Sequence, residues 1–339
     1  MKILVTGGAG YLGTTLVPQL VDAGHDVVVV DRFFFGRAPL ERLSKGGHLT
    51  LVQEDVRWVS GTLFQGIDAV VDMAALSNDP AGDLDPWKTF EINYLGRSRT
   101  ARLAREAGVR RYILTSSCSV YGFQDGLLTE ESSPKPQTAY ARANLLAEGD
   151  VLPLKTADFA PIAIRFATLY GVSARMRFDL AVNAMVLRGL QTGKLPVMKD
   201  GDQWRPFLHV ADAARAIGLL LGSDTDRFAG RTINVGADDQ NFQLRDLAEI
   251  LAAAVTTHPT LEWYGAPDHR SYRVSFERAE KELGFKPAYR PIDTAHEIER
   301  DLKNGGVDTG PRSMTVEWYR HLLTDPAASA EVSLHGIVL

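Results

Sequence analysis

The sequence predicts an α/β fold, namely a doubly wound parallel sheet with a smaller, interleaved C-terminal domain. Short runs of β-branched residues alternate with amphipathic helical segments in the first half of the chain, which is typical of a parallel sheet and not of a β-sandwich. The 339 residues, 45% of them hydrophobic, are enough to bury a large core. After Tyr170-Gly171 the alternation ends and longer loops with arginine and proline follow, which indicates a second domain.

The predicted strands cover residues 2–6, 27–31, 49–53, 69–73, 111–115 and 161–168. The predicted helices cover residues 11–23, 87–107, 137–152, 179–192, 211–221, 244–255 and 292–303. We assign residues 1–170 to the first domain, with returning segments near 205–236, and residues 171–204 and 237–325 to the second. The tail, residues 326–339, lacks a clear period, so we expect it to be loosely ordered or docked on a partner.

The composition favours a role with small molecules. The formal net charge of −5 and the absence of a basic stripe disfavour nucleic acid and anionic lipid as partners, and no apolar run approaches the roughly 18 residues of a membrane span. The single cysteine, Cys118, excludes an internal disulfide framework, and the start at Met1-Lys2 lacks a signal peptide, so we expect a cytoplasmic protein. The histidines show no metal-binding spacing, so we predict no metal site.

A glycine loop between the first strand and the first helix carries the clearest motif. Gly8-Ala9-Gly10-Tyr11-Leu12-Gly13 lets a pyrophosphate rest against N–H groups at the positive end of the helix, as in a Rossmann-type domain. Asp31 ends the second strand, where a carboxylate bonds the adenosine ribose and repels a 2′-phosphate, which favours NAD over NADP. Arg32 follows directly and could soften that preference. The predicted contacts of the cofactor here are Gly7, Gly10, Tyr11, Leu12, Gly13, Asp31 and Arg32.

Further motifs carry a family resemblance over nearly all of residues 1 to 305. They are Asp55-Val56 after the third strand, Ala74-Ala75 after the fourth, Asn93 in a helix, Ser116 to Gly122, Tyr140, Arg165 to Gly171 and Arg205 to Asp212. With the glycine loop, this set resembles the extended short-chain dehydrogenases/reductases, in the branch of nucleotide-sugar epimerases and dehydratases. The resemblance implies that NAD binds the first domain and that the second domain holds a nucleotide-diphosphate sugar between them.

The resemblance also implies which residues contact each ligand. Asp55 and Val56 are expected to flank the adenine, and Ala74, Ala75, Ser77 and Asn93 to lie along the path of the cofactor. Arg205 and Arg270 match arginines that pair with a substrate phosphate, although Arg205 could instead close an interdomain salt bridge. Thr168 stands where many relatives have a phosphate-binding asparagine. Arg175, Arg177 and Asn183 offer other polar contacts to the substrate, unless this loop is only a solvated face.

The catalytic residues that the resemblance implies are Ser117, which holds the substrate oxygen, and Tyr140, which moves its proton. Asn144 stands where the family has a lysine that bonds the nicotinamide ribose and lowers the pKa of the tyrosine. An asparagine keeps the hydrogen bond but supplies no charge. Tyr140 is then a slower acid/base, another cation reaches it in three dimensions, or hydride chemistry is lost; we favour the first two. We expect Asn144→Lys to raise any Tyr140-dependent rate.

Cys118 stands where sugar dehydratases place an acid or base that helps to expel water. A thiol can exchange a proton near neutrality, so we count Cys118 among the candidate catalytic residues, with an inert packing role as the alternative. Ser119 replaces the glutamate of the 4,6-dehydratases, which disfavours a plain 4,6-dehydratase.

The leading hypothesis is an NAD-dependent epimerase or dehydratase that acts on a nucleotide-diphosphate sugar through a transient keto intermediate and regenerates its cofactor in each turnover. The alternatives are a net NAD(H)-dependent reductase or dehydrogenase of a small ketone or alcohol, and a catalytically impaired dinucleotide-binding protein. The resemblance also suggests a homodimer formed through the helices at 87–107 and 137–152.

Overall fold

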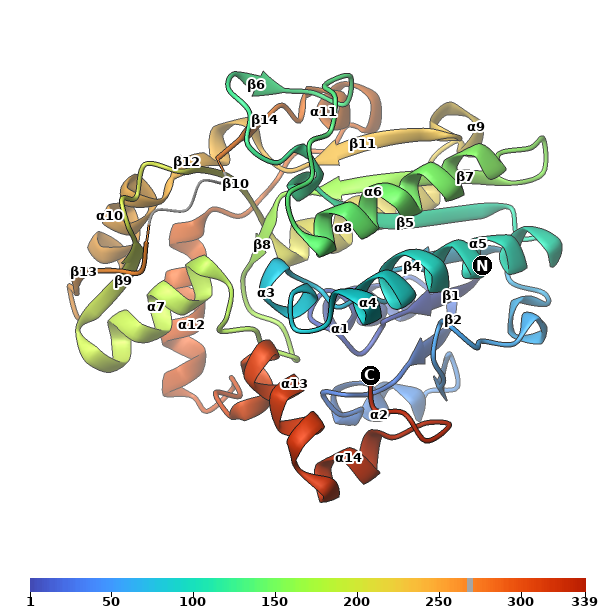
Figure 1. Cartoon of the computed structure of the whole chain (residues 1–339), viewed down its shortest axis with the longest axis horizontal. Coiled ribbons are helices and arrows are strands. Elements are labelled where there is room, and N and C mark those ends of the chain that lie inside the picture. The colour runs from blue at the N-terminus through green and yellow to red at the C-terminus, as the bar shows by residue number, and fades with distance from the viewer. Residues whose placement is uncertain (267–270) are drawn as a thin grey trace.

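A seven-stranded parallel sheet forms the centre of the molecule (Figure 1). The computed structural model describes residues 1–266 and 271–339. The strands of the sheet, in spatial order, are β11 (Arg231–Val235), β7 (Ala160–Phe166), β5 (Arg111–Ser117), β4 (Ala69–Asp72), β1 (Lys2–Thr6), β2 (Asp26–Asp31) and β3 (Leu49–Gln53). The chain order reverses between β1 and β4, and ligands of such sheets bind at the carboxyl ends of the strands beside that point.

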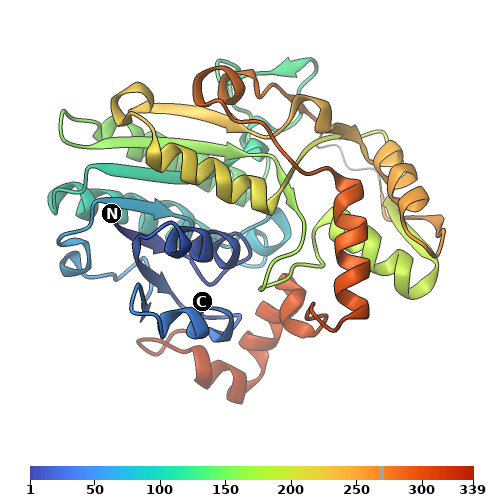
Figure 2. The same cartoon turned by 180° about the vertical axis from the view of Figure 1, so that it is seen from behind.

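Helices cover both faces of this sheet. One face packs against α1 (Gly13–Asp22) and α8 (Val210–Gly222), which lie over the strands in Figure 2. The other face packs against α5 (Arg97–Glu106) and α6 (Ala139–Val151). The remaining elements of this domain are α2 (Ala38–Ser44), η1 (Gly61–Phe64), α3 (Asp79–Gly82), α4 (Pro86–Phe90), η2 (Glu91–Gly96), η3 (Cys118–Tyr121), η4 (Leu152–Leu154) and α9 (Thr225–Phe228).

The second, smaller domain lies beyond the carboxyl ends of the strands. It contains the three-stranded sheet of β8 (Thr168–Tyr170), β10 (Trp204–His209) and β12 (Asn241–Gln243), and the pair β9 (Lys194–Met198) and β13 (Thr260–Tyr264). Its helices α7 (Ala181–Thr192), α10 (Leu244–Ala254) and α12 (Pro291–Lys303) share one apolar core. Its smaller elements are η5 (Asp238–Gln240) and η6 (Pro311–Ser313). The elements β6 (Leu127–Leu128), β14 (Arg273–Val274) and α11 (Glu277–Leu283) share the apolar core of the first domain instead, where α11 packs against β11.

The predicted fold class is confirmed, with two local differences. The predicted helix 87–107 is divided by the π-helix η2, which changes the register of the turns after it. The predicted strand 161–168 ends at Phe166, and Thr168–Tyr170 forms a separate strand of the smaller sheet. In the part of the chain that the structure describes, no helix is long and apolar enough to cross a membrane.

The C-terminal segment differs more from the prediction. Helices α13 (Thr315–Thr324) and α14 (Pro326–Val332) pack against the first domain, where Trp318 and Leu322 share an apolar cluster with Val56 and Ile92. The prediction that residues 315–325 belong to the second domain is therefore wrong. The tail is not loosely ordered either, because the guanidinium of Arg32 donates to the carbonyls of residues 332, 337 and 338 at 2.8–3.0 Å.

Candidate active site

A cleft of about 510 Å³ opens where the two domains meet, a volume within the range of small-molecule sites. It runs along the carboxyl ends of β1, β4 and β5, where the topology of the sheet predicts a ligand. The cleft brings together most of the residues predicted from the sequence. These are Gly7, Gly10, Tyr11, Leu12, Gly13, Asp31, Arg32, Asp55, Val56, Ala74, Ala75, Ser77, Ser117, Tyr140, Asn144, Thr168, Arg177 and Arg205.

The glycine loop has the geometry that a dinucleotide requires. Gly7 has a φ of +68°, and a Cβ atom there would lie 2.8 Å from the backbone nitrogen of Ala74, so only glycine lets the loop approach β4 this closely. Helix α1 begins at Gly13 without a side-chain cap. The N–H groups of Thr14, Thr15 and Leu16 already bond the carbonyls of Gly10 and Leu12, so the donors offered to the cleft are those of the loop residues ahead of them, at the positive end of the helix dipole. This donor set fits the pyrophosphate of a dinucleotide.

Asp31 lies beside this loop at the end of β2. Its Oδ2 accepts the backbone N–H of Ala9 at 2.9 Å and its Oδ1 that of Phe33 at 2.7 Å, which fixes the carboxylate at the wall of the cleft. Burial raises the pKa of Asp31 from its usual value, and the two backbone hydrogen bonds offset part of that rise. A carboxylate held in this way is suited to bond the ribose hydroxyls of an adenosine.

Arg32 has a different role from the one considered from the sequence. Its Nη1 bonds Asp55 Oδ2 at 2.6 Å, and its Nη2 donates to three carbonyls of the C-terminal tail. Both side chains of the ion pair are less than one-tenth exposed. The guanidinium is therefore held by protein partners and does not stand ready to meet a 2′-phosphate.

Two predicted contact residues lie behind the cleft and not in its lining. Asn93 clamps the backbone of Leu76, accepting its N–H at 2.8 Å and donating to its carbonyl at 3.0 Å. Asn183 bonds the N–H of Gly171 and the carbonyl of Arg177, both at 2.9 Å. The predictions that Asn93 contacts the cofactor and that Asn183 contacts the substrate are therefore wrong, because both amides are buried and bonded to protein that shapes the cleft.

Tyr140 and Ser117 meet in the cleft as the sequence predicts. Ser117 ends β5, and its Oγ accepts the N–H of Ser119 at 3.1 Å, which fixes the hydroxyl at the rim of the turn. The pKa of Tyr140 is raised above 10.0, chiefly by burial and then by the nearby carboxylate of Asp79. Arg97 and hydrogen bonds from Asn144 and Ser117 act in the opposite direction on that pKa.

Cys118 is absent from the cleft that its neighbours line. Its side chain is 1% exposed, packs in the core of the first domain and donates from Sγ to the carbonyl of Arg165 at 3.3 Å. Burial raises the pKa of the thiol well above its usual value. An acid/base role in expelling water is therefore wrong for Cys118, and the packing role is the correct one. At the turn from β5 into η3, Ser117 and Ser119 line the cleft, whereas Cys118 packs into the core.

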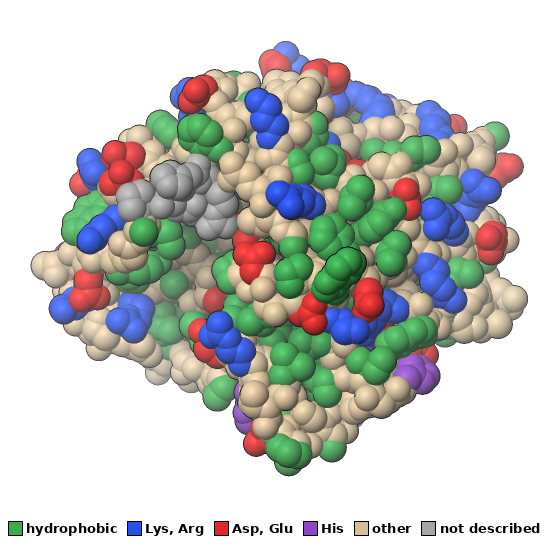
Figure 3. Space-filling view, in the orientation of Figure 1, with side chains coloured by type: hydrophobic (Ala, Val, Ile, Leu, Met, Phe, Trp, Pro, Cys, Tyr) green, Lys and Arg blue, Asp and Glu red, His purple; other side chains and the backbone are tan. Residues whose placement is uncertain are grey.

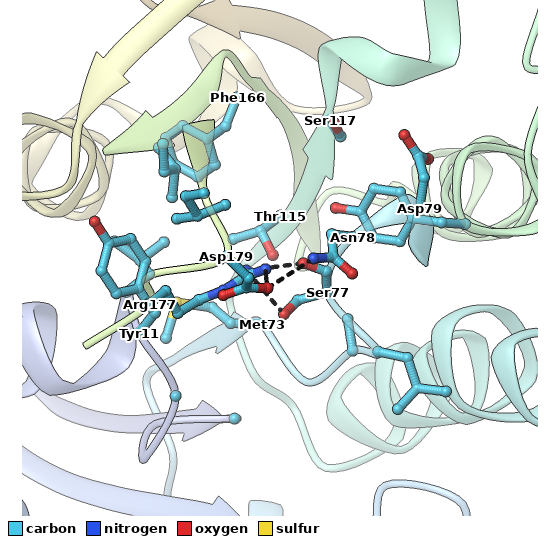
Figure 4. Close-up of a pocket in the computed structure, with 18 of the residues that line it drawn as sticks. Tyr11, Met73, Ser77, Asn78, Asp79, Thr115, Ser117, Phe166, Arg177 and Asp179 are labelled. Carbon is cyan, nitrogen blue, oxygen red and sulfur yellow. Dashed lines mark hydrogen bonds and ion pairs between the residues drawn. The ribbon is translucent and has the colours of Figure 1, made fainter. Parts of the chain in front are cut away.

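The predicted substrate residues lie at the side of the second domain. Thr168 on β8 and Arg205 on β10 both line the cleft, and Arg205 also stacks over the ring of Tyr272 at 5.3 Å. Figure 4 shows Arg177 between Asp179, which it pairs with at 2.7 Å, and Ser77, whose carbonyl accepts from it at 2.9 Å. Arg177 therefore also ties the second domain to the loop after β4. Arg270 lies outside the described residues.

Two aromatic side chains and two further arginines also line the cleft, and of these four residues only Arg175 was predicted to contact a ligand. Phe35 and Tyr319 form an edge-to-face pair at 5.4 Å, so helix α13 supplies part of the wall near Asp31. Arg175 lies 3.5 Å over the ring of Phe35, is 6% exposed and leaves its Nε without a hydrogen-bond partner among the described residues. Arg97, from α5, reaches the cleft behind Asn144. These residues come from distant segments with no local motif.

Comparison with known proteins gives the family of the chain. A model of the NAD dependent epimerase/dehydratase family matches residues 3–236, more than half of the sequence. The chain belongs to this family. Its cofactor is accordingly NAD, and the glycine loop and Asp31 provide the fit on the protein side. Among the described residues, no group of histidine, cysteine and carboxylate side chains is arranged to hold a metal ion.

The individual relatives are distant but cover most of the chain. The uncharacterized UDP-glucose epimerase YtcB of Bacillus subtilis is 29% identical over 304 residues, which span 85% of this chain and 93% of the relative. UDP-glucuronic acid decarboxylase 1 of Arabidopsis thaliana is 27% identical over 320 residues, 90% of this chain and 70% of the relative.

Solved structures agree with these relatives. DesIV, a dTDP-glucose 4,6-dehydratase from Streptomyces venezuelae solved with NAD, superposes with a TM-score of 0.78 at 26% identity over 90% of this chain and 98% of that one. MoeE5 with UDP-glucuronic acid and NAD has a TM-score of 0.77 at 27% identity over 95% of this chain and 99% of that one. These findings support the predicted class of NAD-dependent epimerases and dehydratases and do not favour the reductase alternative.

Proposed function

We propose that the protein epimerises a UDP-linked hexose or hexuronic acid through a transient keto sugar, with NAD kept in the cleft from one turnover to the next. The observation that carries this proposal is the meeting of Tyr140 and Ser117 at the end of the glycine-loop cleft, without a carboxylate at positions 118 or 119. The UDP group and the sugar are inferred from the names of the relatives, two of which act on UDP-glucose or UDP-glucuronic acid.

In this proposal, residues of the first domain hold NAD. The N–H groups of the glycine loop, at the positive end of α1, would bind its diphosphate, and the carboxylate of Asp31 would bind the adenosine ribose. Val56, Tyr319 and Arg175 would enclose the adenosine end. When bound, NAD supplies the hydride acceptor and donor for the sugar. Asn144 presents an amide N–H donor to the nicotinamide end of the cleft.

Tyr140 and Ser117 would carry the proton transfer. The hydroxyl of Ser117 is fixed by the N–H of Ser119, so it can hold the oxygen of the reacting sugar hydroxyl in one place. Tyr140 would accept the proton of that hydroxyl while the carbon is oxidised, and return it when the carbon is reduced on its other face. Because burial raises the pKa of Tyr140, ionisation is the costly part of this step.

The turn at residues 117–119 favours epimerisation over dehydration. Loss of water from a keto sugar needs a second acid/base pair that removes a proton from carbon and protonates the leaving hydroxyl. Cys118 is buried away from the cleft, and Ser119 carries only a hydroxyl. Epimerisation needs no such pair, since Tyr140 acts on the same oxygen in both directions.

Arginines of the cleft would neutralise the diphosphate of the substrate. Arg205 lines the cleft on the side of the second domain, and a guanidinium bonds phosphate oxygens through two parallel N–H groups. Arg177 is already bound to Asp179 and Ser77, so its role would be to hold the two domains in register around the sugar.

A panel of UDP sugars tests the function. Purified protein without added cofactor should convert UDP-glucose or UDP-glucuronic acid into an epimer, detected by NMR, and should release NAD(H) on denaturation. Tyr140→Phe should abolish conversion while it retains the bound NAD(H). Absence of NAD(H) together with absence of conversion across the panel would refute the proposal, and a water-loss product would replace epimerisation by dehydration.

A second copy of the chain is the partner that we propose for the outer face of α4, η2 and α6. Exposed hydrophobic side chains gather there: Trp87 is 80% exposed, Leu95 54% and Leu146 45% (Figure 3). A monomer rarely leaves such side chains together in water. Light scattering should give the mass of a dimer, and Trp87→Glu/Leu146→Glu should give that of a monomer. The cytoplasmic location stays a prediction from the sequence.

A further inference from the structure

A buried arginine stands behind the catalytic tyrosine. Arg97 is the first residue of α5, directly after the π-helix η2, and its side chain is 1% exposed. A π-turn inserts an extra residue into the helix and rotates the residues after it, and such turns are frequent at functional sites. Here the rotated residue is an arginine that reaches the floor of the cleft beside Asn144.

The two edges of the guanidinium of Arg97 have different partners. Nε donates to Asp72 Oδ2 at 3.2 Å, and Nη2 donates to the Asp72 carbonyl at 2.9 Å and to the carbonyl of Thr115. Nη1, at the other edge, donates to Asn144 Oδ1 at 3.1 Å. The Asp72 carboxylate is anchored by the hydroxyls of Thr6 at 2.6 Å and Tyr112 at 2.7 Å. The ion pair is thus a fixed dipole whose positive end faces Asn144.

Asn144 lies between Arg97 and Tyr140, and its amide bonds both residues. Its Oδ1 accepts from Arg97, so its Nδ2 must face the other way, and Nδ2 donates to the carbonyl of Tyr140 at 3.1 Å. An amide nitrogen carries two hydrogens, so one N–H remains for the cleft that Asn144 lines. Arg97 therefore orients the amide as a donor toward the tyrosine and the nicotinamide end of the cleft.

We propose that Arg97 is the positioning residue of the reaction: it aims the Asn144 amide at the site and supplies the positive charge beside Tyr140 that position 144 itself lacks. This inference rests on the proposed function, because it assigns the assistance that Tyr140 needs in that chemistry. Two residues thus share the roles of the family's lysine: the amide of Asn144 on α6 donates the hydrogen bond, and the guanidinium of Arg97 on the neighbouring α5 supplies the charge.

The groups facing Tyr140 come from several elements and oppose one another. Burial is the largest influence and raises the pKa of Tyr140, and the Asp79 carboxylate on α3 raises it further. Arg97 on α5 lowers it, as do the hydrogen bonds of Asn144 on α6 and Ser117 at the end of β5. Arg97 is the cation in this set that favours the ionised tyrosine.

The structure also reverses the expectation for Asn144→Lys. A lysine there would put an ammonium group within hydrogen-bond distance of the Arg97 guanidinium, in a pocket where positions 97 and 144 are each 1% exposed. Two buried like charges destabilise each other and depress the pKa of the lysine. Asn144→Lys alone should therefore lower both the melting temperature and kcat. A lysine at position 144 should support the reaction only when Arg97 is also replaced.

Direct titration of Tyr140 is the first test. The protein without substrate is labelled at the tyrosine rings, and the Tyr140 signal is assigned by its loss in Tyr140→Phe. Arg97→Gln should raise the pKa of Tyr140 by about one unit, the low end of the effect of a nearby charge, whereas Arg97→Lys should leave it close to that of the wild type. An unchanged pKa in folded Arg97→Gln would overturn the inference.

Relocation of the charge is the second test. Arg97→Gln removes the positive charge beside Tyr140. The double variant Arg97→Gln/Asn144→Lys returns a positive charge to the helix of Tyr140, close to Asp72. The double variant should recover the thermal stability and the kcat–pH profile that each single variant loses, and a double variant no better than either single variant would overturn the inference.

Failures of the two proposals can be told apart. If the wild type converts no UDP sugar while the Tyr140 signal moves as predicted, the proposed function fails and the role of Arg97 stands. If the wild type converts the sugar and Tyr140→Phe does not, but Arg97→Gln keeps the pH profile of the wild type, the role of Arg97 fails alone.

Discussion

Replacing Arg32 with glutamine should release the C-terminal tail from the first domain. Arg32 holds Asp55 at 2.6 Å and the carbonyls of residues 332, 337 and 338 at 2.8–3.0 Å. Breaking a buried ion pair costs about 3–5 kcal/mol when the other charge is left alone. Asp55 keeps two bonds from the guanidinium of Arg57, at 2.8 and 3.0 Å, and one from the backbone N–H of Arg57 at 2.9 Å, so it is not left alone. The remaining loss, charge-assisted bonds to Asp55 and the tail, is about 2–3 kcal/mol.

Two assays measure this loss. The melting temperature should fall by roughly 3–4 °C, and limited proteolysis should cut within residues 326–339 before the rest of the chain unfolds. Arg37→Gln is the matched control. The Arg37 side chain is 41% exposed, pairs with Glu41 on the surface and donates to Gln53 Oε1 at 2.7 Å, and neither partner belongs to the tail, so this variant should leave the tail protected. Equal protection of the tail in Arg32→Gln and the wild type would refute the account of the docked tail.

Three further results are expected. Asp31→Ser should weaken NAD binding about ten- to hundredfold, because it removes charge-assisted bonds of about 1.5–3 kcal/mol, and dialysis should find NADP binding reduced less; an unchanged NAD affinity would contradict the assigned role. Cys118→Ala should keep kcat within about twofold and lose only stability, whereas Ser117→Ala should lower kcat at least about tenfold, and the reverse order would return the thiol to the mechanism. Burial raises the pKa of Tyr112 and Tyr170 above 10.0, so their contribution to stability is complete below that pH and is lost above it. As pH rises beyond about 10, the free energy of unfolding from urea titrations should fall by up to about 1.4 kcal/mol per pH unit for each tyrosine. A free energy of unfolding that stays constant above pH 10 would contradict this expected loss of stability.

Features that depend on local order were predictable from the sequence. The strand, glycine loop, helix and acidic residue at Gly7 to Asp31 are consecutive, so their chemistry follows from spacing alone. Ser117 and Tyr140 follow from motifs with the same local character. The parallel sheet followed from the alternation of strands and helices.

The rest depends on contacts between distant segments. Arg97 lies 47 residues from Asn144, and only the register set by the π-helix turns it toward the cleft. Tyr319 reaches Phe35 because α13 folds back onto the first domain. The error at Cys118 has a simpler cause: its motif gives its place in the chain but not which way the side chain points, and β5 ends with Ser117 facing the cleft. Asn93 and Asn183 were predicted to contact the cofactor and the substrate, respectively, but both amides bond backbone that shapes the cleft.

The fate of the hydrogen on the reacting carbon tests the central claim most directly. A UDP sugar with deuterium at that carbon is incubated in ordinary water with the purified protein and no added cofactor. The account predicts an epimer that retains the deuterium, because the hydride leaves and returns within one cleft, and no epimer with Tyr140→Phe. Loss of the deuterium to solvent, or equal conversion by Tyr140→Phe, would contradict it.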